Sequence, residues 1–135
     1  MLIGPNSKPI TESDDGTIIA IVSQATVYTK SFSLRKGEYF AVSYKAASSG
    51  NIKLQIELEQ SYRKPTTEGS ADATWAIGEG ATAIETALAD TTQHHKTMSP
   101  IPVAFGRLKI TGLPDANGNA ATTTLTAFLS KQEQA

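Results

Sequence analysis

The sequence predicts an all-β protein, an antiparallel two-sheet β-sandwich or jelly roll of about eight short strands. Short segments rich in β-branched and aromatic residues recur along the chain, with turn-forming residues between them. Several of these segments alternate apolar and polar residues with a period of two, the pattern of a half-buried strand. No strand–helix–strand repeat is present, so neither a parallel sheet nor a dinucleotide-binding fold is expected.

The composition limits the classes of function. A chain of 135 residues fits one domain, which we place at residues 17–135 after an extended N-terminal arm at residues 1–16. Without cysteine the chain has no disulfide framework, thiol nucleophile or zinc–thiolate site. The net charge is −1, so no basic excess predicts binding to nucleic acid or to an anionic membrane. No apolar run approaches the ~20 residues of a membrane span, and the opening residues lack a secretion signal, which predicts synthesis in the cytoplasm.

The arm has little periodicity and contains Pro5, Pro9 and tandem aspartates. Two interpretations stay open: a disordered terminus, and an arm that becomes ordered by lying across a neighbouring subunit. In the second interpretation Pro5 and Pro9 are interface residues.

The first half of the domain predicts four strands, in the segments Thr17–Val22, Ala25–Leu34, Tyr39–Ala46 and Ile52–Glu59. The last alternates most cleanly, with an aliphatic face and a fully polar face. Because a polar turn precedes it, we expect Tyr39–Glu59 to form a hairpin.

The middle of the chain, residues 62–102, is rich in glycine and small residues. Thr74–Ile77 is a candidate strand that carries the only tryptophan, Trp75. Ala81–Ala89 fits a helix or a strand, and its β-rich surroundings favour the strand. His95–Ser99 predicts a further short strand.

The closing stretch, Val103–Lys131, predicts a hairpin of two strands around one turn. In the first strand the apolar phase changes at Gly106, which indicates either a bulge or a strand buried on both faces. In the second strand Leu125, Ala127 and Leu129 share the core face. The opposite face is rich in threonine and carries Phe128, which suits a surface or an intersubunit contact.

Candidate chemical groups are few. His94 and His95 are adjacent, so on a strand they point to opposite faces and are poorly placed to chelate one metal. Glu57 and Glu59 share a strand face, which favours a solvated face over a catalytic carboxylate pair. The sequence therefore predicts no catalytic residue, no metal site and no cofactor.

Three aromatic residues and one arginine suggest contact surfaces. Trp75, with Tyr62 and Tyr44, is a candidate for stacking on a sugar ring, although a core or interface role is favoured for a single tryptophan. Arg107 lies within an apolar strand, where it is expected to pair with a carboxylate or to cross a subunit boundary.

The segment Ser99–Glu133 resembles small structural proteins of tailed bacteriophages. In that group a proline-containing segment leads into an aromatic–x–Arg–hydrophobic strand, a turn with asparagine and glycine, and a threonine-rich last strand. The matching positions here are Phe105, Arg107, Ile110, Gly112 and Asn119. A weaker likeness reaches back to the strand Lys53–Glu59 and to Trp75, so that about half of the chain is covered.

The resemblance implies a non-enzymatic virion protein, most directly a capsid decoration (cement) protein on the capsid surface, made in the host cytoplasm. It implies a homo-oligomer, with a trimer favoured, and the major capsid protein or other virion proteins as partners. The interface residues that we expect are Pro5, Pro9, Arg107, Phe128 and Trp75. The alternative is a carbohydrate- or receptor-binding β-sandwich module.

Overall fold

The computed structural model describes residues 2–10, 19–22, 25–34, 40–48, 53–67, 73–77, 83–98, 104–113 and 122–134. Within these ranges every helix-or-strand element is a β-strand. The strands are β1 (Leu2–Pro9), β2 (Ile19–Val22), β3 (Thr26–Tyr28), β4 (Phe32–Ser33), β5 (Phe40–Ser48), β6 (Leu54–Ser61), β7 (Ala76–Ile77), β8 (Glu85–Leu88), β9 (His94–Met98), β10 (Phe105–Gly112) and β11 (Thr122–Gln134). The described part of the chain has no helix of the length and hydropathy that a membrane crossing requires.

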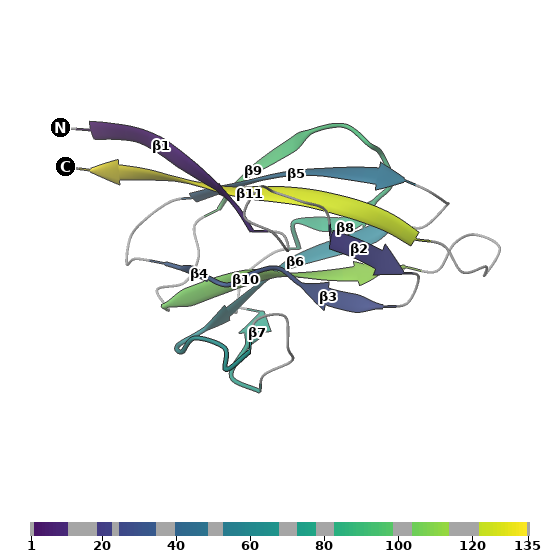
Figure 1. The fold of residues 1–135 in the computed structure, drawn as a ribbon, viewed down its shortest axis with the longest axis horizontal. Coiled ribbons are helices and arrows are strands. Elements are labelled where there is room, and N and C mark those ends of the chain that lie inside the picture. The colour runs from purple at the N-terminus through teal and green to yellow at the C-terminus, as the bar shows by residue number, and fades with distance from the viewer. Residues whose placement is uncertain are drawn as a thin grey trace.

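The strands form two antiparallel sheets packed face to face (Figure 1). In the first sheet β1 and β2 pair with successive stretches of β11, which also pairs with β5, and β5 pairs with β9. In the second sheet β3 and β4 pair with one edge of β10, whose other edge pairs with β6, and β7 and β8 pair with the far edge of β6.

Where two short strands pair with the same edge of one neighbouring strand, they form one column. Across the described residues each sheet then has four columns. Numbered in chain order, the columns run 1-8-3-6 in the first sheet and 2-7-4-5 in the second. This order is that of a jelly roll, in which consecutive columns often cross from one sheet to the other. The predicted all-β, two-sheet sandwich is therefore confirmed.

The core lies between the inner faces of the two sheets. Each central strand contributes alternate apolar residues that are nearly or fully buried: Phe40, Val42, Tyr44 and Ala46 from β5, Leu125, Ala127 and Leu129 from β11, Leu54, Ile56 and Leu58 from β6, and Leu108 and Ile110 from β10. Each large aliphatic side chain buried in this way contributes about 1.5–3 kcal/mol of gross stabilisation. The period-two pattern in the sequence therefore arises because each of these strands turns one face to the core.

Two predicted hairpins are wrong. β5 pairs with β11 and β9, whereas β6 lies in the other sheet, so Tyr39–Glu59 is not a hairpin. The closing stretch also divides, because β10 belongs to the second sheet and β11 to the first. In both cases the apolar faces of consecutive strands meet across the core. A hairpin and a cross-sheet connection leave the same alternation in the sequence, so alternation did not distinguish them.

The strand β10 contains no bulge at Gly106. Its pairing with β6 runs in continuous register from Phe105, opposite Ser61, to Gly112, opposite Leu54. A side chain at Gly106 would place Cβ 2.7 Å from the ring of Phe32, which occupies that space. The glycine therefore permits close packing, and the bulge is wrong. The alternative of a strand buried on both faces holds only in part, because on the outer face Arg107 is buried whereas Phe105, Lys109 and Thr111 are half-buried.

Two further predictions concern the segment Ala81–Ala89 and the N-terminal arm. The segment Ala81–Ala89 contains the strand β8, so the strand interpretation is confirmed over the helix. The boundary between an arm and the domain at residue 16 lies outside the described residues. Figure 1 shows β1 and the end of β11 running side by side beyond the other strands, with both termini at that end.

Candidate functional site

A buried ion pair lies on the outer face of the second sheet. Arg107 in β10 is 1% exposed, and its Nε donates a hydrogen bond to Oε1 of Glu59 over 3.0 Å. The two residues lie directly opposite each other on β10 and β6. Because their strand neighbours Leu108 and Leu58 face the core, alternation turns Arg107 and Glu59 to the other side of the sheet.

Two aromatic rings enclose the guanidinium group. The Cζ atom of Arg107 lies 3.9 Å from the ring centroid of Tyr28 and 4.6 Å from that of Trp75. Tyr28 comes from β3, and Trp75 immediately precedes β7. Both distances fit cation–π contacts. One side chain therefore joins β3, β10, β6 and the segment before β7.

This cluster is costly to disturb. A buried charge is tolerated when it is paired and hydrogen-bonded, and removal of one partner leaves the other charge uncompensated. The prediction that Arg107 pairs with a carboxylate is confirmed. The expectation of a solvated face is wrong for Glu59, which is 7% exposed, because its carboxylate pairs with the buried guanidinium of Arg107.

An exposed apolar corner adjoins the cluster. Among the described residues, the large hydrophobic side chains that are exposed are Tyr62 (69%) and Ile77 (42%). Ile77 pairs with Glu59, and Tyr62 follows Ser61, whose hydroxyl donates a 2.9 Å hydrogen bond to the Thr74 hydroxyl. These contacts hold the end of β6 beside β7.

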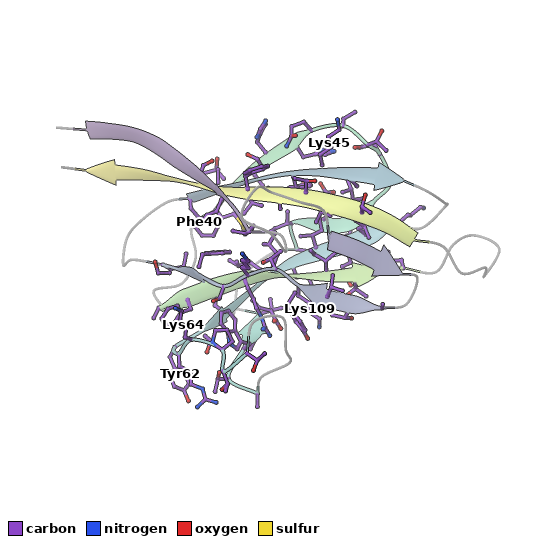
Figure 2. All side chains as sticks on the ribbon, in the orientation of Figure 1. Phe40, Lys45, Tyr62, Lys64 and Lys109 are labelled. Atoms are coloured by element: carbon purple, nitrogen blue, oxygen red, sulfur yellow. The ribbon has the colours of Figure 1, made fainter. Side chains whose placement is uncertain are left out.

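We call this region the β6–β7 corner and define it by its exposed residues Tyr62, Arg63, Lys64, Ala73, Ala76 and Ile77. Figure 2 shows Tyr62 and Lys64 at this end of the molecule, far from Lys45 on the first sheet. The corner therefore combines apolar side chains with two cations.

A second polar cluster lies at the β9 edge of the first sheet. The ring of His94 stacks on the ring of Tyr44, with centroids 5.3 Å apart and planes 13° apart. His94 Nε2 is 2.7 Å from Oδ1 of Asp90, which also accepts hydrogen bonds from the amide and hydroxyl of Thr92. The hydrogen bond from His94, followed by those from Thr92, lowers the pKa of the Asp90 carboxyl.

Two more contacts complete this edge. The Tyr44 hydroxyl donates to Oε2 of Glu85, and burial together with this carboxylate raises the pKa of Tyr44. His95 Nδ1 is 2.7 Å from the Ser43 hydroxyl. Since Asp90 bonds to His94 and Ser43 bonds to His95, the serine, histidine and aspartate do not form one relay.

The two histidines take opposite faces, as their adjacency predicts. His95 is exposed, whereas His94 is half-buried and stacks on Tyr44. Within the described ranges no three metal-ligating side chains of the His, Cys, Asp and Glu types come together.

The structure brings the predicted interface residues together in two places. Arg107 and Trp75 stack in the cluster described above. Pro9 lies opposite Phe128 on β1 and β11, and Pro5 lies in β1 where the register shifts between Ile3 and Asn6. Their role as interface residues stays a prediction.

The proposed sugar-stacking surface does not exist as a unit. Tyr44 is 2% exposed in the first sheet, Trp75 is 6% exposed on the second, and Tyr62 alone is open to solvent. The sequence pointed to Arg107 through its position in an apolar strand. The stacking partner Tyr28 and the contact between His94 and Tyr44 carried no such signal, because both depend on which strands become neighbours.

Comparisons with known proteins give a match at the level of the fold. No protein-family model matches the sequence, and no curated protein matches it. Among solved structures, a chain in the structure of infectious bursal disease virus, Gx strain, matches with a TM-score of 0.56 and 14% sequence identity. The match covers 96% of this chain and 32% of the viral chain, so the present chain spans about a third of that protein. At this identity the match shows a shared fold.

Proposed function

We propose that this chain is a non-enzymatic structural protein of a virion. The observation that carries the proposal is the eight-column jelly roll, whose fold is shared with a chain of a virus structure over 96% of the present sequence. Jelly rolls serve in viral capsids, in lectins and in cupins, so the fold alone does not select the role.

The character of the polar clusters supports a role in contact. The ion pair of Arg107 and Glu59 is enclosed by aromatic rings and holds four segments of the second sheet together. An enclosed ion pair of this kind makes the surrounding surface rigid, and its charged groups are not accessible to a substrate. A rigid outer face and a filled core suit a protein that is repeated many times in a shell.

The finer form of the proposal is a capsid decoration protein of a tailed bacteriophage. It rests on the resemblance of Ser99–Glu133 to that group, with β10 and β11 as the strands concerned. The chain then forms a homo-oligomer, with a trimer favoured, on the capsid surface and binds the major capsid protein or another virion protein. The arm that contains Pro5 and Pro9 contributes to contacts between subunits.

The first test is the mass of the purified chain in solution. Sedimentation equilibrium across a range of concentrations measures the oligomer for the full chain and for a chain that lacks residues 1–9. Since β1 pairs with β11, circular dichroism must first show that the shortened chain keeps its β-structure. A trimer or larger assembly that dissociates on truncation supports the proposal. A monomer at every concentration, indifferent to truncation, contradicts it.

A further inference from the structure

Little charge lies on the outer face of the first sheet. In β11 the residues Leu125, Ala127 and Leu129 are buried in the core, so the residues between them face outward, and the same alternation holds on β5. The outward side chains that the structure describes on β5, β9 and β11 are Ala41, Ser43, Lys45, His95, Thr97, Thr124, Thr126, Phe128 and Ser130. Among them Lys45 bears the one permanent charge, on the side of the sheet that is turned away from the second sheet (Figure 2).

The strand register joins these side chains into one surface. Ser43 of β5 lies opposite Phe128 on one side and opposite His95 on the other, and Lys45 lies opposite Thr126. Residues that lie directly opposite each other place their side chains on the same face, about 4.5–5.5 Å apart. The Ser43 hydroxyl is also 2.7 Å from His95 Nδ1, which links β5 to β9 across this face.

The outer face of the second sheet has a different character. There Glu59 pairs with Arg107, and Glu57 lies opposite Lys109, so β6 and β10 carry opposite charges across from each other. Depletion of charge is the compositional signature of the centre of a protein interface. The first sheet therefore has the face that is better suited to contact.

Contact through the edges of the first sheet is disfavoured. On β9, Lys96 lies opposite the buried Val42 and so belongs to the core-facing side of an edge strand, where a charge opposes edge-to-edge pairing. At the other edge, the amide of Ile10 donates to the carbonyl of Ala127, so alternation turns the nitrogen of Pro9 away from β11. A proline there offers no donor to a further strand. Face-to-face packing is thus favoured over addition of a strand.

We propose that the outer face of the first sheet is a contact surface for a second copy of this chain, packed sheet against sheet about a two-fold axis. The inference rests on the proposed function, in which copies of the chain assemble, and names the surface that joins them. A partner rich in charge would bury its charges without counter-charges, which is unfavourable. A second copy instead brings hydroxyl groups, which both donate and accept hydrogen bonds.

The size of the face is adequate for such a pair. Four columns about 4.8 Å apart and the nine residues of β5, at about 3.4 Å each, give a flat area of roughly 600 Å² per copy. Specific protein interfaces begin at about 600 Å² per partner.

The charge of Lys45 does not oppose the contact. If the two-fold axis runs along β11, the two copies of Lys45 lie one strand spacing to either side of it and one sheet spacing apart, a separation of about 14 Å. This distance exceeds the Debye length of about 8 Å at physiological salt, so their repulsion is largely screened.

The test replaces Thr124 of β11 by glutamate, because a residue near the axis meets its own copy and two carboxylates would then face each other. Thr111→Glu is the matched control, since it makes the same change at a half-buried threonine on the outer face of the second sheet. Circular dichroism confirms the fold of each variant. Sedimentation equilibrium over a range of concentrations then measures the assembly mass of the full chain, of both variants, and of an equimolar mixture of Thr124→Glu with Thr124→Lys.

We expect an even number of copies in the assembly of the full chain, half that number for Thr124→Glu, and the full number for Thr111→Glu. Pairing should weaken at least about tenfold in Thr124→Glu, because like charges that meet at an interface are unfavourable, and the mixture should recover the full mass because opposite charges then meet.

The inference is overturned if the full chain contains an odd number of copies, if Thr124→Glu keeps the full mass, if Thr111→Glu lowers the mass as much, or if the mixture stays at the lower mass. A trimer that Thr124→Glu leaves intact would overturn this contact and still support the virion function, so the two can fail separately. A chain that is monomeric at every concentration contradicts both.

Discussion

Replacement of Arg107 by methionine tests the buried cluster most directly. The change removes the 3.0 Å hydrogen bond to Glu59 and leaves that carboxylate in a site that is 7% exposed. Loss of one partner of a buried ion pair costs about 3–5 kcal/mol. The two cation–π contacts, to Tyr28 and Trp75, are each worth about 0.5–2 kcal/mol and overlap with that figure. Small domains are stable by about 5–15 kcal/mol in total, so the variant should lose a large fraction of its stability.

A double-mutant cycle separates the pair from its surroundings. Glu59→Leu alone should also be costly, since it leaves the guanidinium buried without its carboxylate. The combined variant should cost far less than the sum of the two, because an apolar pair of similar volume fits a site enclosed by aromatic rings. Arg107→Lys keeps the charge but loses the planar group that stacks between Tyr28 and Trp75, so it should lie between the wild type and Arg107→Met.

The assay is urea unfolding followed by far-ultraviolet circular dichroism. The fluorescence of Trp75 is unsuitable as the signal, because it depends on the contact with Arg107 that the substitution changes. Free energies of unfolding from the four corners of the cycle give the coupling energy between Arg107 and Glu59. Additive single changes, or a loss below about 1 kcal/mol for Arg107→Met, would show that water compensates the charges and would refute the enclosed pair.

Three further changes test other features. Gly106→Ala should cost about 1–3 kcal/mol in unfolding experiments, because the new methyl group meets the ring of Phe32 at 2.7 Å, and Phe32→Leu should recover part of the loss. Trp75→Phe should change the unfolding free energy little, since the buried indole nitrogen has no acceptor among the described residues, whereas Trp75→Ala should be clearly destabilising. Tyr44→Phe should flatten the fall in stability at alkaline pH: the pKa of Tyr44 is raised above 10.0 in the fold, so its contribution is complete below about pH 10 and is lost as the pH rises toward the raised pKa. A pH titration of unfolding that falls equally steeply for Tyr44→Phe would exclude that role.

The sequence located strands well because strand signals are local. In β6 the alternate aliphatic residues that predict a core face, Leu54, Ile56 and Leu58, are all buried. The register of β10 on β6 was not predictable in this way, because alternation states which face of a strand is apolar and not which strand lies beside it. The predicted hairpins failed for that reason.

The candidate site was predictable in part. Arg107 stood out because a charge inside an apolar strand needs a partner, and it has one. Glu59 looked solvated because Gln55 and Glu57 share its face of β6. It is buried with Arg107, its ion-pair partner, and the guanidinium is itself enclosed by Tyr28 and by Trp75, which comes from a segment later in the chain. A cover of this kind depends on a connection that no local pattern encodes.

The filled interior bears on how the jelly roll works in this protein. Some jelly rolls hold a ligand between their sheets, whereas here the facing positions carry Val42, Ile56 and Leu125, each fully buried against the opposite layer. A ligand placed between the sheets would have to displace these side chains, and the loss of one large apolar side chain from a core costs about 2–5 kcal/mol.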